Sequence, residues 1–214
     1  MNNAPPSREV ADERPVEIQA GSALLRNRIP RRDAEVLSVA TQGGLVCLGK
    51  THMSELAFSG LGLNPVTETP PCINDEDAVS GGSSSGAAAS VAYGLAPAAI
   101  GSDTGGSVRI PAAWNDLVGL KTTAGRLSIK GIVPLCDSFD SIGPLARNVE
   151  DCAHVLAALD GVRPRFSDRV ALTVVLADTL SGDPVIPLFE GEGFADSASD
   201  SFAEGEGAQW CVAF

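Results

Sequence analysis

Two segments rich in glycine and serine are the parts of this sequence best suited to chemistry. GGSSSG covers residues 81–86 and GSDTGGS covers residues 101–107. Glycine lets the backbone adopt positive φ, so successive N–H groups can converge on one point and form a nest for an anion. Such a nest can hold a phosphate, or it can stabilise the oxyanion of an acyl-transfer reaction, with a serine at its end as the nucleophile.

Two other interpretations of these segments compete with acyl transfer. Glycine and serine favour turns, so both segments can be flexible surface turns. A phosphate site would call for GxxxxGK[ST], or for GxGxxG after a strand, and the sequence contains neither.

The elements around the two segments favour a functional site. The alanine-rich sequence after Gly81 predicts a helix from about Ser84 to Tyr93, and APAAIG predicts a short buried strand at 96–101. A loop, a helix, a strand and a second loop can bring the two loops together at one end of a parallel sheet, where α/β proteins keep their sites.

The rest of the chain extends this pattern to an α/β fold. We expect a mixed, largely parallel sheet flanked by helices on both sides. The further elements predicted are a helix within 32–44, a buried strand at 45–49, one or two helical turns at 54–58, a loop at 59–80, strands at 118–121 and 170–176, and a helix at 149–159 capped by Asn148 and ended by Gly161.

The composition and net charge of the chain argue against some classes of binding partner. The 214 residues are 44% hydrophobic and carry a formal net charge of −12, with a pI near 4.5. Nucleic acid and anionic membrane surfaces repel such a chain, so we expect neither as a partner. The N-terminus has no signal-peptide pattern and no stretch is long and apolar enough to span a membrane, which predicts a cytoplasmic protein.

The residues that usually bind metals are sparse. Five scattered cysteines form no CxxC pair, and His52 and His154 are the only histidines. We therefore expect a reduced protein with no metal.

Residues 79–145 resemble the signature region of the amidase signature family, the Ser–Ser–Lys hydrolases of carboxylic amides. The matching segments are GGSSSGAAASVAYGL, GSDTGGSVRIPAAWNDLVGLKTT and GIVPLCDSFDSIGPLAR, and weaker similarity extends over about 21–161. The sequence from IPAAWN to GRLS is more similar to free-standing amidases than to components of tRNA-dependent amidotransferases.

The resemblance implies roles for some of the residues of the two loops. Ser107 matches the family nucleophile, and Ser83 matches the bridging serine, which the family holds after a cis peptide bond. The backbone N–H groups of Thr104, Gly105, Gly106 and Ser107 match the oxyanion hole. Arg109 is expected to pair with a carboxylate and brace the nucleophile loop.

The general base of the family is a lysine in a GIPxxxKD motif, which this sequence lacks. By the same resemblance Lys50 and Lys121 match non-catalytic positions, and Lys130 lies in a turn. The expected organisation is a loose leader at 1–20, a partial amidase core at 21–161 and a divergent acidic segment at 162–214 that is partly disordered.

These observations lead to one function and one alternative. From the resemblance we expect hydrolysis of the C–N bond of a small carboxylic amide through a serine acyl-enzyme, with no cofactor. The alternative is a truncated, non-catalytic relative without the general base. The sequence leaves open whether the chain forms a homo-oligomer.

Overall fold

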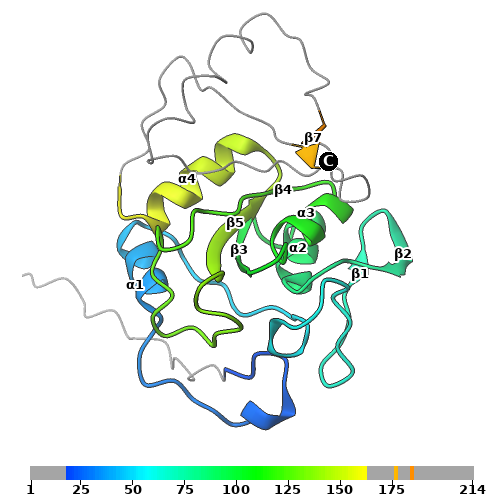
Figure 1. Cartoon of the computed structure of the whole chain (residues 1–214), viewed down its shortest axis with the longest axis horizontal. Coiled ribbons are helices and arrows are strands. Elements are labelled where there is room, and N and C mark those ends of the chain that lie inside the picture. Colours follow the sequence, from blue (N-terminus) through cyan, green and yellow to red (C-terminus); the bar gives the residue numbers. More distant parts are fainter. Residues whose placement is uncertain (1–17, 163–175, 178–183, 186–214) are drawn as a thin grey trace, which may run out of the picture.

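A small central sheet with helices on both faces forms the frame of the molecule (Figure 1). The computed structural model describes residues 18–162 and two short strands, β6 (Leu176–Ala177) and β7 (Pro184–Val185). The predicted α/β class is confirmed. The expectations for most of the leader and of the acidic segment lie outside the described residues.

The central sheet has the strand order β3-β5-β4. Strand β3 (Ala98–Asp103) and strand β4 (Val118–Gly119) each pair with β5 (Ser141–Ala146) in the antiparallel sense. The predicted parallel pairing is therefore wrong for the described strands. Helix α3 (Arg109–Trp114) does connect β3 to β4, two strands that run in the same direction, but β5 returns from a later segment and lies between them.

Apolar side chains from both faces of the sheet bury against helices. On one face, α2 (Ser85–Ala92) and α3 cover a cluster that includes Val91, Val108 and Leu145. The other face packs against α4 (Val149–Leu159), which contacts α1 (Glu35–Gln42) in a second cluster, and Figure 1 shows these two pairs of helices on opposite sides. The sheet thus fixes the ends of β3 and α2, where the two glycine-rich loops begin and end.

Two local features show how the sequence fixes this frame. The Asn148 side chain accepts a hydrogen bond from the Asp151 amide at 2.8 Å, so α4 begins at the predicted cap. A β-carbon on Gly143 would lie only 1.8 Å from the carbonyl oxygen of Leu120, so only glycine lets β5 run so close to the chain after β4.

The structure corrects two further predictions. Residues 45–49 form no strand, and Val46 is 81% exposed, because no described strand lies beside this apolar run. The segment expected to be a loop contains a hairpin of β1 (Pro71–Cys72) and β2 (Asp75–Val79). In the described part of the chain, no helix is long and apolar enough to cross a membrane.

Candidate active site

The two glycine-rich loops meet in the structure. Ser83 lies just before α2, and Ser107 lies in the turn that leads into α3. The amide of Ser84 donates a hydrogen bond to the carbonyl oxygen of Ser107 at 3.1 Å, and the Ser84 hydroxyl donates to the carbonyl oxygen of Ser102 at 3.3 Å. The peptide bond between Gly82 and Ser83 is cis, as the resemblance implies.

The two serine hydroxyls differ in exposure and in bonding. Ser83 is fully buried, and its Oγ has no hydrogen-bond partner among the described residues. Ser107 is 8% exposed. The structure thus brings the two loops together, while no hydrogen bond joins the two hydroxyls. Catalytic hydrogen bonds are often long in an unliganded site and tighten when substrate binds.

The backbone amides around Ser107 are not equivalent. The Gly106 amide donates to Oδ1 of Asp103 at 2.8 Å, so it is already engaged, which differs from the role expected for it. The amides of Thr104, Gly105 and Ser107 have no acceptor in the described part of the chain. A β-carbon placed on Gly105 would meet no atom within 4 Å, so this part of the loop borders open space.

Asp103 organises the nucleophile loop through its carboxylate. This group is fully buried and also accepts a hydrogen bond from the Val108 amide at 3.2 Å. Arg109 donates to both carboxylate oxygens, at 3.0 and 3.1 Å, which confirms the predicted pairing of this arginine. Lys121 Nζ lies 3.4 Å from Oδ1. Burial by itself raises the pKa of Asp103, but the hydrogen bonds and charge of Arg109, with the charge of Lys121, hold that pKa below its ordinary value.

Asp140 is a second carboxylate beside the loops, and no sequence motif pointed to it. The Thr104 hydroxyl donates to its Oδ1, and its Oδ2 accepts the amides of Leu135 and Cys136 at 2.9 and 3.0 Å. Asp140 directly precedes β5, whose first residue pairs with Asp103 at the end of β3. The register of this pairing, once known, is the signal that places Asp140 beside the Thr104 loop.

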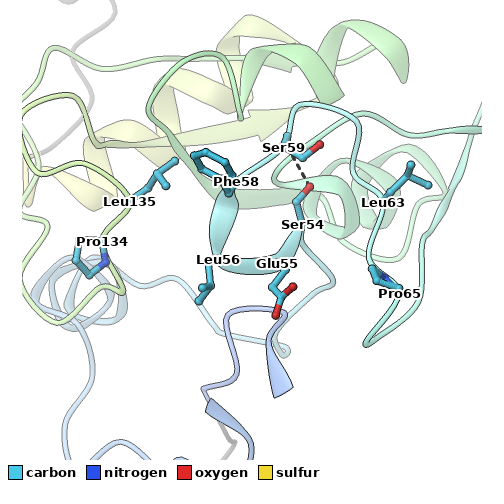
Figure 2. Close-up of a pocket in the computed structure, with 9 residues that line it drawn as sticks. All are labelled: Ser54, Glu55, Leu56, Phe58, Ser59, Leu63, Pro65, Pro134 and Leu135. Atoms are coloured by element: carbon cyan, nitrogen blue, oxygen red, sulfur yellow. Dashed lines mark hydrogen bonds between the residues drawn. The ribbon is translucent and has the colours of Figure 1, made fainter. Parts of the chain in front are cut away.

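A pocket of about 530 Å³ is lined by nine residues of the segments 54–65 and 134–135, none of which belongs to the two glycine-rich loops (Figure 2). We call it the 54–59 pocket. The Ser54 amide donates to the carbonyl oxygen of Ser83 at 3.0 Å, and the Gly82 amide donates to that of Gly60 at 2.8 Å. Leu135, on the other wall, is bonded to Asp140. The walls of the pocket are therefore hydrogen-bonded, directly or through Asp140, to both loops.

No lysine of the described residues contacts the Ser83 hydroxyl, although Lys121 does contact Asp103. Lys121 Nζ donates to the carbonyl oxygen of Asp103 and to the hydroxyl of Ser141, at 2.5 and 3.0 Å. The Lys130 side chain is 84% exposed, 3.5 Å from Glu35. Lys50 lines a separate pocket of about 400 Å³, where burial lowers its pKa.

His52 and His154 are both exposed, and His154 Nδ1 lies 3.0 Å from the backbone carbonyl oxygen of Glu150 on its own helix. Within the described residues, no group of histidine, cysteine and acidic side chains could hold a metal ion.

Comparison with known proteins places this geometry in a family. The profile of the Amidase family matches residues 12–181. The A subunit of glutamyl-tRNA(Gln) amidotransferase from Oenococcus oeni is 44% identical over 170 residues, which are 79% of this chain and 32% of the relative. Its counterpart from Lysinibacillus sphaericus is 39% identical over 87% of this chain and 40% of the relative. The chain thus spans about a third of the length of these relatives.

Solved structures agree with the sequence comparison. A crystal structure of an amidase superposes with a TM-score of 0.62 at 38% identity, over 67% of this chain and 33% of the other. The A subunit of glutamyl-tRNA(Gln) amidotransferase from Thermotoga maritima superposes with a TM-score of 0.65 at 33% identity, over 72% of this chain and 36% of the other. Both an amidase and a component of an amidotransferase are thus among its structural relatives. The family match and the identities show that this chain belongs to the amidase family.

Proposed function

We propose that the chain carries the acyl-transfer centre of an amidase that hydrolyses small carboxylic amides, with Ser107 as the nucleophile. Its Oγ attacks the amide carbonyl carbon while Ser83 accepts the Ser107 proton and gives up its own hydroxyl proton to the nitrogen of the scissile amide. The C–N bond then breaks, the amine leaves with a proton, and the acyl group stays on Ser107 as an ester. Water hydrolyses this ester and regenerates the serine.

The oxyanion formed in each step needs preorganised donors. The amides of Thr104, Gly105 and Ser107 are the candidates, because they have no acceptor among the described residues. The Gly106 amide instead fixes the loop to Asp103. Removing one such donor from a hydrolase typically costs about 10²–10³-fold in rate, so the rigidity of this loop is part of the proposed catalysis.

One observation carries the proposal. The Ser84–Ser107 hydrogen bond joins a loop that contains a buried, unpartnered hydroxyl to a loop in which three amides have no acceptor among the described residues. A flexible surface turn would not bury Ser83 completely, and a phosphate site would have no need of a buried hydroxyl without a partner.

A fluorophosphonate probe at neutral pH tests the proposal. We expect the probe to label the full chain and not to label Ser107→Ala, and we expect labelling to decrease strongly in Ser83→Ala. Ser128→Ala is the control and should be labelled like the unmodified chain, because the Ser128 hydroxyl donates a hydrogen bond to Glu35 and belongs to neither glycine-rich loop. Absence of labelling in the unmodified chain would contradict an active hydrolase.

A second candidate is a non-catalytic member that binds amides. It is supported by the Ser83 hydroxyl, which no described lysine contacts. If this candidate holds, fusing a GIPxxxKD segment upstream of the chain should increase the labelling rate, because a general base contributes about 10²–10⁴-fold. Labelling that is already fast, and unchanged by the fusion, would eliminate it.

A further inference from the structure

A second pocket, of about 400 Å³, has no role in the proposed reaction, and we call it the 50–52 pocket. One wall is formed by α2, and the others are formed by the segment 50–52 and by the two prolines at the start of β1. Neither Ser83 nor Ser107 lines it. Its volume is within the range of pockets that bind small organic molecules.

The walls of the 50–52 pocket are fixed to one another by the fold. The Gly86 amide donates a hydrogen bond to the carbonyl oxygen of His52 at 2.9 Å. A β-carbon on Gly86 would lie 2.4 Å from the His52 amide nitrogen, so only glycine lets the segment 50–52 lie so close to α2. At the other end of the helix, the Tyr93 hydroxyl donates to the carbonyl oxygen of Cys72 at 3.3 Å and joins α2 to β1. The pocket is thus formed before any ligand binds, which lowers the cost of binding.

The polar groups of this pocket favour an anion. Lys50 supplies an ammonium group, and His52 supplies an imidazole that has no hydrogen-bond partner in the described part of the chain. No aspartate or glutamate is among the ten lining residues, although the chain as a whole carries a formal net charge of −12. Burial lowers the pKa of Lys50, and the charges of Cys47 and Asp33, which do not line the pocket, act in the opposite direction. An anion beside a partly desolvated ammonium gains more than it would in open water.

The rest of the lining is mostly apolar and is incompletely covered. Tyr93 is 40% exposed and Leu95 is 76% exposed, and both face the pocket together with two adjacent prolines. An apolar group bound here would cover these side chains. One ammonium can balance one carboxylate, whereas a phosphate dianion would keep an uncompensated charge against an apolar wall.

We propose that the 50–52 pocket is a second ligand site, separate from Ser83 and Ser107, that binds a small carboxylate with an aromatic or aliphatic body. Lys50 pairs with the carboxylate, while Tyr93 and Leu95 contact the apolar body. The site goes beyond the proposed function, because it requires neither the nucleophile nor the oxyanion donors.

Three ligands of similar shape test the charge preference. Benzoate is an anion, benzyl alcohol is neutral and benzylamine is a cation. Their Kd values for the full chain can be measured by ligand-observed NMR titration. We expect benzoate to bind about fivefold more tightly than benzyl alcohol, and benzylamine to bind most weakly. Equal affinities for the three ligands, or phenyl phosphate binding more tightly than benzoate, would overturn the inference.

Two pairs of variants locate the bound carboxylate. Lys50→Met keeps an apolar side chain but removes the charge, so it should weaken benzoate binding about fivefold and leave benzyl alcohol binding unchanged. Lys130→Met is the matched control, since it removes the same charge from a side chain that is 84% exposed and does not line the pocket.

Leu95→Ala should weaken binding of both ligands about two- to threefold, because apolar contact is lost. Leu48→Ala, at a residue that is 74% exposed and outside the pocket, should not. Equal effects of a variant and its control would overturn the assignment.

Protection of Lys50 tests occupancy in the unmodified chain. The full chain is treated with a limiting amount of an acetylating reagent, with and without benzoate, and acetylation of Lys50 and Lys130 is followed by peptide mass spectrometry. Benzoate at twice its Kd should slow acetylation of Lys50 about threefold and leave Lys130 unchanged. Lack of protection at Lys50 would overturn the inference.

The outcome is distinguishable from that of the proposed function. Ser107→Ala should bind benzoate as tightly as the unmodified chain, even if no fluorophosphonate labelling is observed. Loss of benzoate binding in Ser107→Ala would place the carboxylate at the proposed nucleophile and overturn the second site.

Discussion

Asp103 is the charged side chain on which the nucleophile loop depends most directly. It is completely buried, and it accepts hydrogen bonds from two amides of the loop and from the Arg109 guanidinium. A buried carboxylate is tolerated only when it is paired in this way, so removing its charge removes the ion pair with Arg109 and weakens the hydrogen bonds that hold the loop.

Asp103→Asn should therefore lower the free energy of unfolding by about 3 kcal/mol, because the fully buried carboxylate loses its ion pair with Arg109 and its charge-assisted hydrogen bonds. Urea denaturation at neutral pH measures this change. Asp160→Asn is the matched control, since Asp160 pairs with Arg126 in a more exposed setting and should cost no more than about 1 kcal/mol. Equal losses in the two variants would contradict the role assigned to Asp103.

The low pKa of Asp103 also makes stability depend on pH. In the folded chain this carboxyl binds a proton more weakly than in the unfolded chain, whose ordinary value is 3.8. Its contribution is therefore complete above about pH 5 and is lost as the pH falls below 3.8 through the folded pKa. The gap in unfolding free energy between the unmodified chain and Asp103→Asn should shrink when urea denaturation is repeated at acidic pH. A gap that stays constant would show that the charge of Asp103 is not its source.

At the scale of elements, Asp140 joins the start of β5 to two loops. It accepts the Thr104 hydroxyl with one oxygen and the amides of Leu135 and Cys136 with the other. This arrangement connects one wall of the 54–59 pocket to the loop whose amides we propose as the oxyanion hole.

Asp140→Ala should loosen the segment 131–140, because two amides and one hydroxyl lose their acceptor at once. We expect faster hydrogen exchange in peptides that contain Leu135 and Cys136, and a loss of about 2 kcal/mol in stability. Asp137→Ala, an exposed change in the same segment, should leave both unaffected. Exchange that is equal in the two variants would show that Asp140 does not hold this wall.

The elements near the site were easier to predict than their pairing. Helix α2 follows from its alanine-rich sequence, and α4 follows from its period and its Asn148 cap. The antiparallel pairing of β5 was not predictable, because its residues Ser141–Ala146 include Gly143 and Pro144 and give no clear strand signal. The turn at 54–59 was missed as a pocket wall for a similar reason: positive φ at Leu56 and Ala57 is imposed by hydrogen bonds to residues distant in sequence.

At the scale of the whole molecule, the sheet and its two helical faces hold the ends of the two loops together. Sequence motifs identified Ser83, Ser107 and the cis peptide bond through the family resemblance, and the structure brings their loops into contact. The engagement of the Gly106 amide by Asp103 was not predictable, because it depends on the direction of one carboxylate. The exposed apolar run at 45–49 shows the same limit, since burial of a strand depends on its neighbours and not on its own composition.

The central claim is that Ser107 forms an acyl ester, and trapping that ester is the most direct test. The full chain is incubated with an activated aryl ester, quenched in acid and mapped by peptide mass spectrometry. We predict one acyl group on the peptide that contains Ser107, absent from Ser107→Ala. An acyl group on Ser83 or on another serine, or no acyl group on the chain at all, would contradict the claim.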